Sequence, residues 1–394
     1  GTAPGNPRLS EGFTEQPILV WGEALRDYDF GPGHPLTPKR FGPGVDLIKA
    51  MGAERLVEPH EATHDELERL HAAHYIEQVR SFSDHPWQPA AMGIGSGDVP
   101  AFHGMHEASA LIAGGSIGAV DRILAGEADH AFSPAGGLHH AMRTRAAGFC
   151  IYNDVALAVA RARDAGHRVL YIDLDVHHGD GVEVLFQDDP EVLTFSVHES
   201  GRSLFPGTGM VDEIGEGKGQ GFAVNAPLDH GVGDESWWTV VDQMLPVLAD
   251  MFKPSFIVSQ HGCDTHALDP LAHLRLTTAS YRRATELVDT LAHEHAGGRW
   301  FATGGGGYDA FRVVPRSWAL VWLAQAHREV PATTPVEWRE RWNDAAEAFG
   351  QGPMPVDLVD PPRTVAPDPD VIVARELKRG RESMMQSLRL QASC

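Results

Sequence analysis

The sequence predicts an α/β protein, with one domain built on a mostly parallel β-sheet that carries helices on both faces. Two observations predict this class. From about residue 100 onward, apolar runs rich in β-branched residues alternate with helical segments, a pattern typical of parallel sheets covered on both sides. Polar residues suited to chemistry directly follow three of these apolar runs. Because ligands of parallel sheets bind at the carboxyl ends of the strands, we expect the active site at that edge.

The predicted elements follow one another in a regular order. Residues 104–126, rich in Gly, Ala and Ile, predict a helix that packs closely on its neighbours. A second helix is expected at 153–166, with Asn153 or Asp154 as N-cap and Gly166 as C-cap. The other strands are expected at 167–176, 191–197, 222–228, 255–260 and 299–303, and the other helices at 235–252 and 277–295.

We expect three regions along the chain: an N-terminal extension at 1–16, a main domain at 17–350 and a C-terminal region at 351–394. The first part of the C-terminal region is rich in proline, which predicts a linker or a segment lying on the body. Its last part, 371–391, holds five basic and two acidic residues. That part is expected to form a helix that docks on the acidic body or on a second subunit, or else a frayed tail.

Composition narrows the class of protein. Hydrophobic residues make up 42% of the chain and charged residues 22%, without an apolar run long enough to span a membrane. We see no leader with a charged segment followed by an apolar segment, the pattern that would predict secretion. Three cysteines, far apart in the chain, do not indicate a disulfide framework, so a reducing cytoplasm is the expected location.

The charge balance bears on possible partners. The chain carries 32 basic and 54 acidic residues, a formal net charge of −22. This charge would repel phosphate backbones and argues against nucleic-acid binding. It would tolerate cationic substrates such as lysine-bearing segments or polyamines, although solubility alone also accounts for it.

A first group of chemical residues follows the predicted strand at 167–176, in the stretch DLDVHHGD. Residues two apart share one face of an extended strand, so Asp173, Asp175 and His177 are expected to point the same way. Two carboxylates and an imidazole suit a divalent cation, which would compensate charges that are costly to bury unpaired. A surface loop of acids and histidines is the alternative.

A second group follows the predicted strand at 255–260, in QHGCDTH. Asp264 could complete a site of two Asp and one His. Three protein ligands leave a coordination position open, which is the mark of a catalytic metal. Considered alone, Asp264 is an ordinary loop residue.

Two further motifs offer acid/base groups. In PAGGLHHAM, His139 and His140 are adjacent and could both be tuned by carboxylates. In TGGGGYDAF, four glycines after a strand deliver Tyr308, which could donate a hydrogen bond to an oxyanion. A surface pair of histidines and a flexible turn are the respective alternatives.

Taken together and in this order, five stretches closely resemble the zinc-dependent histone deacetylases, with the arginase/deacetylase fold. The resemblance runs from about residue 31 to about Trp318 and is closest to the bacterial acetoin utilization deacetylases. The stretches that carry it are SPAGGLHHAMRTRAAGFCIYND, VLYIDLDVHHGDGVEVLF, FPGTG, QHGCDTHALDP and GGGGY.

The resemblance implies roles for the residues of these motifs. The implied metal ligands are Asp175, His177 and Asp264. The expected ion is Zn²⁺, although this oxygen-rich set would also accept Fe²⁺ or Co²⁺. Asp173 would then be a supporting group that hydrogen-bonds His139, and Asp180 would orient His140. Tyr308 would face the substrate carbonyl, and His178 is expected to be structural.

The resemblance also implies a narrow tunnel for an acyl-lysine stem. The residues expected along the tunnel are Gly148, Phe149, Phe205, Leu271 and Gly306. Asp98 would grip the substrate backbone at the rim, and Arg40 would lie near an internal acetate channel. A structural K⁺ or Na⁺ is expected at Asp173, Ser196 and the carbonyls of Asp175, His177 and Val197. Where several eukaryotic members have an aliphatic residue, this chain has His266, which we expect to alter the tunnel.

The implied activity is metal-dependent hydrolysis of Nε-acetyl-lysine in proteins or peptides, inhibited by hydroxamates that bind the metal. Three alternatives stay open. The substrate could be an acetylpolyamine or another small amide. A binuclear ureohydrolase of the arginase type shares the fold, but its second ion needs a carboxylate where this chain has His266. A catalytically inactive acyl-lysine binding module would be expected to have lost Tyr308 or a His–Asp partner, and all are present.

Overall fold

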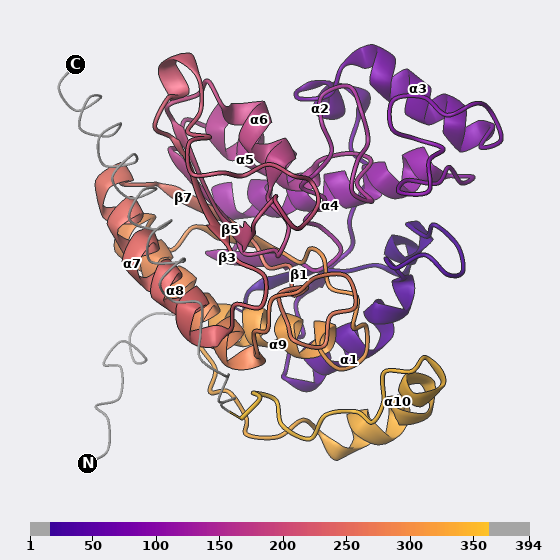
Figure 1. The fold of residues 1–394 in the computed structure, drawn as a ribbon, viewed down its shortest axis with the longest axis vertical. Helices are drawn as coiled ribbons and strands as arrows, with labels where there is room; N and C mark the ends of the chain where they lie inside the picture. The colour runs from indigo at the N-terminus through magenta and orange to yellow at the C-terminus, as the bar shows by residue number, and fades with distance from the viewer. Residues whose placement is uncertain (1–15, 362–394) are drawn as a thin grey trace.

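A computed structural model describes residues 16–361 (Figure 1). The chain forms a single sheet of eight strands, and every strand pairing is parallel. Along the sheet the strand order is β2-β1-β3-β8-β7-β4-β5-β6. The strands are β1 (Ile18–Val20), β2 (Leu56–Val57), β3 (His130–Ser133), β4 (Val169–Asp173), β5 (Val192–Glu199), β6 (Ala223–Leu228), β7 (Phe256–Gln260) and β8 (Trp300–Thr303).

Helices cover both faces of the sheet (Figure 1). On one side α4 packs on α5, and on the other α7, α8, α9 and α1 pack in succession. The α-helices are α1 (Phe41–Ala50), α2 (His64–Glu68), α3 (Ala73–Asp84), α4 (Met105–Leu124), α5 (Asp154–Asp164), α6 (Asp180–Phe186), α7 (Asp234–Phe252), α8 (Thr278–His295), α9 (Val314–Gln325) and α10 (Val336–Ala348). Among residues 16–361, no helix is both long and apolar enough to cross a membrane.

Local sequence explains where these elements lie. The central strand β4 reads VLYID and is buried throughout, as expected of a parallel strand covered on both faces. Helix α5 begins after Asn153, whose side chain accepts a hydrogen bond from the N–H of Ala156. In α4, a Cβ on Gly114 would lie 1.8 Å from the carbonyl oxygen of His60, so the small residue is needed where that segment crosses the helix. The fold class, helices α4 and α5, and the positions of the buried strands agree with the sequence predictions.

The strand order gathers four polar segments at one edge. Strands β3, β8, β7 and β4 are consecutive neighbours in the sheet, and their carboxyl ends lead into residues 134–142, 304–308, 261–264 and 174–180. These segments contain the four motifs singled out in the sequence. The sheet therefore brings them together at the edge where ligands of parallel sheets bind.

The C-terminal region lies on the body over the part that the structure describes. Leu358 is fully buried, and Asp360 forms an ion pair of 2.6 Å with Arg316 in α9. Of the two expectations for this region, residues 351–361 therefore follow the second, a segment lying on the body. The basic stretch at 371–391 and residues 1–15 of the N-terminal extension lie outside the described residues.

Candidate metal centre and active site

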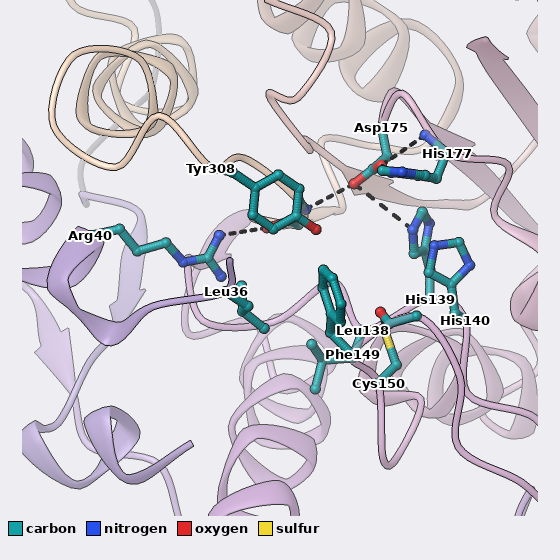
Figure 2. A pocket seen from close by; sticks show the side chains of 14 residues that line it. Leu36, Arg40, Leu138, His139, His140, Phe149, Cys150, Asp175, His177 and Tyr308 are labelled. Carbon is teal, nitrogen blue, oxygen red and sulfur yellow. Dashed lines mark hydrogen bonds and ion pairs between the residues drawn. The ribbon is translucent and has the colours of Figure 1, made fainter. Parts of the chain in front are cut away.

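A pocket opens at the carboxyl edge of the sheet (Figure 2). Its wall combines apolar side chains with the imidazoles, carboxylate and phenol of the sequence motifs. The residues that line it are Leu36, Arg40, Gly137, Leu138, His139, His140, Gly148, Phe149, Cys150, Asp175, His177, Gly305, Gly306 and Tyr308.

Asp175, His177 and Asp264 form a compact group of potential metal ligands. Nδ1 of His177 lies 3.2 Å from Oδ1 of Asp175 and 3.0 Å from Oδ2 of Asp264, and all three residues are buried. The backbone of the glycine-rich loop lies directly against this group. A Cβ on Gly306 would lie 2.1 Å from Oδ2 of Asp264, so only glycine fits there. Two carboxylates and one imidazole, close enough to share one ion, fit a divalent cation.

The electrostatics of this group also favour a cation. Burial, and next the carboxylate of Asp175, raise the pKa of Asp264 to about 6. A third buried carboxylate, Asp269, lies nearby and its pKa is raised for the same two kinds of reason, burial and a neighbouring carboxylate. Negative charges so close together are costly to bury without a compensating positive charge.

The path of the chain here differs from the sequence prediction. Strand β4 ends at Asp173, three residues before the expected end, and the following residues form a tight loop. In this loop the N–H of Asp175 donates to Oδ1 of Asp173, and the N–H of His177 donates to Oδ1 of Asp175. Asp175 and His177 still converge, but the carboxylate of Asp173 turns toward His139 instead of joining them.

Two histidine–aspartate pairs stand beside the ligand group, and Figure 2 shows their histidines, His139 and His140, next to Asp175 and His177. Nδ1 of His139 lies 2.7 Å from Oδ2 of Asp173, and Nδ1 of His140 lies 2.6 Å from Oδ1 of Asp180. Burial opposes a charge on His139, but the Asp173 and Asp175 carboxylates outweigh it and raise the pKa of His139 to about 9. Burial, and then the neighbouring His139, lower the pKa of His140. The two adjacent imidazoles therefore prefer opposite charge states at neutral pH.

Tyr308 and Arg40 occupy the opposite side of the pocket (Figure 2). Tyr308 is held through its backbone, because its N–H donates to Oδ2 of Asp269 and its carbonyl accepts from Nε2 of Gln351. Arg40 is buried and its Nη1 donates to the carbonyl of Gly305 at 2.7 Å. Its guanidinium therefore fixes the glycine-rich loop from the interior.

Two aromatic residues pack against pocket side chains and are held differently: Phe149 is part of the pocket lining, and Phe205 lies outside it. Phe149 has a φ of +68°, which is unusual for a bulky residue, and its ring packs edge-on against Tyr308 at 5.8 Å. The loop before it is fixed by Asp98, whose Oδ2 accepts from the N–H of Gly148 at 2.7 Å. Phe205 is 45% exposed and its ring lies 5.0 Å from that of His140.

Comparison with known proteins places these residues in a family. The family model described as "Histone deacetylase domain" matches residues 34–325. The chain is 41% identical over 363 residues to acetoin utilization protein AcuC of Bacillus subtilis (strain 168), covering 87% of this chain and 94% of that protein. AcuC of Staphylococcus xylosus is 37% identical over 335 residues, with coverage of 83% and 87%. The chain belongs to the histone deacetylase family.

Solved structures agree with this assignment to the histone deacetylase family. The crystal structure of an HDAC homolog complexed with SAHA has 29% identity and a TM-score of 0.82, covering 93% of this chain and 100% of that chain. The structure of an HDAC homolog from Aquifex aeolicus has 28% identity with the same TM-score and coverage. The fold is therefore the arginase/deacetylase fold of that family, whose members are metal-dependent hydrolases.

The position of His266 differs from the sequence expectation. Its Nε2 lies 2.8 Å from Oδ2 of Asp360, and its Nδ1 accepts from the N–H of Leu268. The ring is 3% exposed and is not part of the pocket lining. The ring of His266 is thus held by Asp360 of the C-terminal segment, and an effect of His266 on the tunnel stays a prediction. Leu271 is half-buried and also lies outside the pocket lining.

The residues expected around a monovalent cation are buried side by side. Asp173 and Ser196 are register partners of β4 and β5, and Val197 follows in β5. Oδ2 of Asp173 also accepts a hydrogen bond from the hydroxyl of Tyr171, and Oγ of Ser196 lies 2.8 Å from Nδ1 of His198. Occupancy by K⁺ or Na⁺ stays a prediction.

Several residues that support the site were missed in the sequence. Nε2 of Gln260 donates to Oδ2 of Asp175 at 2.8 Å, and Asp154 accepts the N–H groups of Gly137 and Leu138, which shapes the loop before the two histidines. Gln260 was visible as the last residue of a predicted strand. His178 has the structural contacts expected of it, with Glu183 and Thr208.

Proposed function

We propose that the chain hydrolyses the amide of Nε-acetyl-lysine in proteins or peptides and releases acetate. The observation that carries the proposal is the convergence of the Asp175–His177–Asp264 group, two His–Asp pairs and Tyr308 on one pocket. A divalent ion at the three ligands, Zn²⁺ or alternatively Fe²⁺ or Co²⁺, would polarise the carbonyl and lower the pKa of an attacking water molecule.

The side chains divide the proton transfers between them. His140 accepts a proton from the attacking water at Nε2, because Asp180 holds its Nδ1–H and burial favours the neutral imidazole. His139, paired with Asp173, contributes mainly positive charge. As the water oxygen bonds to the carbonyl carbon, the Tyr308 hydroxyl donates to the developing oxyanion. His140 then returns the proton to the lysine nitrogen as the C–N bond breaks.

The pocket lining supports an alkyl-amide substrate. Leu36, Leu138 and Phe149 provide an apolar wall next to the polar end of the pocket, which suits the methylenes of a lysine side chain. Asp98 is exposed at the rim, where we propose that it holds the substrate backbone. A related structure is described as complexed with SAHA, and we propose that hydroxamates bind here too. Two buried free thiols, Cys150 and Cys263, support a reducing, cytoplasmic location.

A second candidate substrate is an acetylpolyamine. The net charge of −22 favours a small cationic amide as well as a lysine-containing peptide. The two substrates share the same bond cleavage, so the residues of the pocket do not separate them.

The test is turnover of an acetyl-lysine peptide and of acetylputrescine by the same preparation. We expect acetate release from the peptide with the higher kcat/KM, and no release from either substrate by Asp264→Ala. Preference for acetylputrescine would replace the peptide proposal with the alternative. Absence of acetate from both substrates in the metal-loaded protein would overturn both.

A further inference from the structure

A second group of potential ligands lies at the opposite edge of the sheet. His130 is the first residue of β3, Asp289 and His293 stand one turn apart near the end of α8, and His327 follows α9. All strands are parallel, so the amino end of β3 faces away from the active-site edge. None of these four residues belongs to the pocket described above.

The distances within this group match those around a tetrahedral ion. With Zn–N bonds of about 2.0 to 2.1 Å, the ligand atoms of a tetrahedral zinc site are about 3.3 Å apart. Nε2 of His130 lies 3.2 Å from Nε2 of His293 and 3.2 Å from Oδ1 of Asp289. Oδ1 of Asp289 lies 3.4 Å from Nε2 of His293 and 2.9 Å from Nε2 of His327. One ligand atom from each residue falls within 4.8 Å of every other.

The three imidazole rings are also oriented as metal ligands are around a shared ion. The ring of His130 is inclined at 83° to His293 and at 76° to His327, and His293 is inclined at 55° to His327, so none of the three pairs is stacked. Hydrogen bonds alone would require three imidazole N–H groups to converge on a single oxygen of Asp289, with two of the nitrogens facing each other at 3.2 Å.

The burial and backbone of the group suit an enclosed ion. His130 is fully buried, and Asp289, His293 and His327 are partly buried. His327 adopts a φ of +52°, uncommon for a residue with a side chain, and this backbone turns its ring toward the group.

We propose that His130, Asp289, His293 and His327 bind one structural Zn²⁺ or a similar first-row divalent ion. Four protein ligands complete a tetrahedron and leave no open position for substrate, in contrast to the three ligands of the active site. The ion would join the start of β3 to the carboxyl ends of α8 and α9. Its role is to stabilise the fold, and turnover does not require it.

The test is the zinc content of the full chain after dialysis against low micromolar Zn²⁺ and removal of the excess. Wild-type protein is expected to hold one more ion per chain than the variant His293→Ala/His327→Ala. That variant should keep its turnover of an acetyl-lysine peptide and unfold at a lower temperature. Asp264→Ala should instead lose the active-site ion and turnover. The readout is the difference in zinc content between wild type and the double variant. This difference does not require the active site to hydrolyse acetyl-lysine, so the test does not depend on the proposed function.

The control is His295→Ala, in the last turn of the same helix and outside the ligand group. It should retain the zinc content of the wild type. His293 and His327 are 28% and 22% exposed, so their truncation opens no core cavity. Should the double variant fail to fold by circular dichroism, His327→Gln removes one partly exposed ligand and is measured in its place. Equal zinc content in wild type and ligand variant would overturn the proposal.

Discussion

At the scale of single residues, neighbours in the sequence are given different properties by their partners. His139 and His140 are adjacent, but Asp173 and Asp175 favour a charged His139, while burial and that charge favour a neutral His140. Two residues of one type thus acquire different charge states from their environment alone. The proposed mechanism uses this difference, with His139 as electrostatic stabiliser and His140 as proton acceptor.

Tyr308 is the residue whose role can be tested with the least structural disturbance. Burial, followed by the carboxylates of Asp264 and Asp175, raises the pKa of Tyr308 well above its ordinary value, so its hydroxyl stays protonated as a donor. We expect Tyr308→Phe to lower kcat on an acetyl-lysine peptide by on the order of 10²-fold or more, the usual effect of losing one oxyanion donor.

The control for this prediction is metal content. Tyr308 is held through its backbone N–H and carbonyl, so the substitution should leave the zinc content and the melting temperature unchanged. Turnover close to that of the wild type would contradict the assigned role.

Short motifs predict much of this site because they place their residues locally. The three ligands and both His–Asp pairs were found on adjacent strand ends, and the structure brings them together. Gln260 could not be assigned from the sequence because its contact with Asp175 joins two different strands. The contact of His266 could not be assigned for a similar reason: its partner Asp360 is 94 residues further along the chain.

At the scale of elements, the sequence predicted part of the fold. The strands and helices that it predicted were located to within a few residues. Strands β1, β2 and β3 and helices α1, α2, α3, α6, α9 and α10 were not predicted. Strands β1 and β2 have three and two residues, too few to show a period. Strand β4 was extended too far because DLDV alternates like a strand, although Asp173 and Asp175 hydrogen-bond as a loop.

The segment 351–361 is anchored by one carboxylate. Asp360 forms an ion pair with the buried Arg316 and bonds the ring of His266. We expect Asp360→Asn to lower the free energy of unfolding by about 2 kcal/mol, because a buried guanidinium loses its charged partner while the partly exposed carboxylate moderates the effect. Chemical denaturation measures this, and Asp357→Asn, an exposed neighbour, is the matched control.

The pH dependence of this anchor has a definite sign. Burial alone would raise the pKa of Asp360, but His266 and Arg316 outweigh it and hold that pKa well below its usual range. The anchor therefore contributes its stability above the unfolded-state pKa of about 4 and loses it as the pH falls further. The stability difference between wild type and Asp360→Asn should shrink on acidification; a constant difference would contradict this assignment.

At the scale of the whole molecule, the net charge of −22 predicts an ionic-strength effect on substrate capture. We expect kcat/KM for an acetyl-lysine peptide with flanking lysines to fall as salt is added, because screening weakens long-range attraction. The measurement is steady-state turnover over a salt series, with a peptide carrying flanking glutamates as control. Parallel salt profiles for the two peptides would show that the protein's charge plays no part in capture.

Phe149 and Phe205 differ in how freely evolution can exchange them. Phe149 has a left-handed backbone conformation and packs on the ring of Tyr308, so exchanging it disturbs both the loop and the phenol. Phe205 is 45% exposed and packs edge-on against His140, so its exchange affects the interior less. Under the proposed function, we expect changes of substrate preference to arise at position 205 more readily than at position 149.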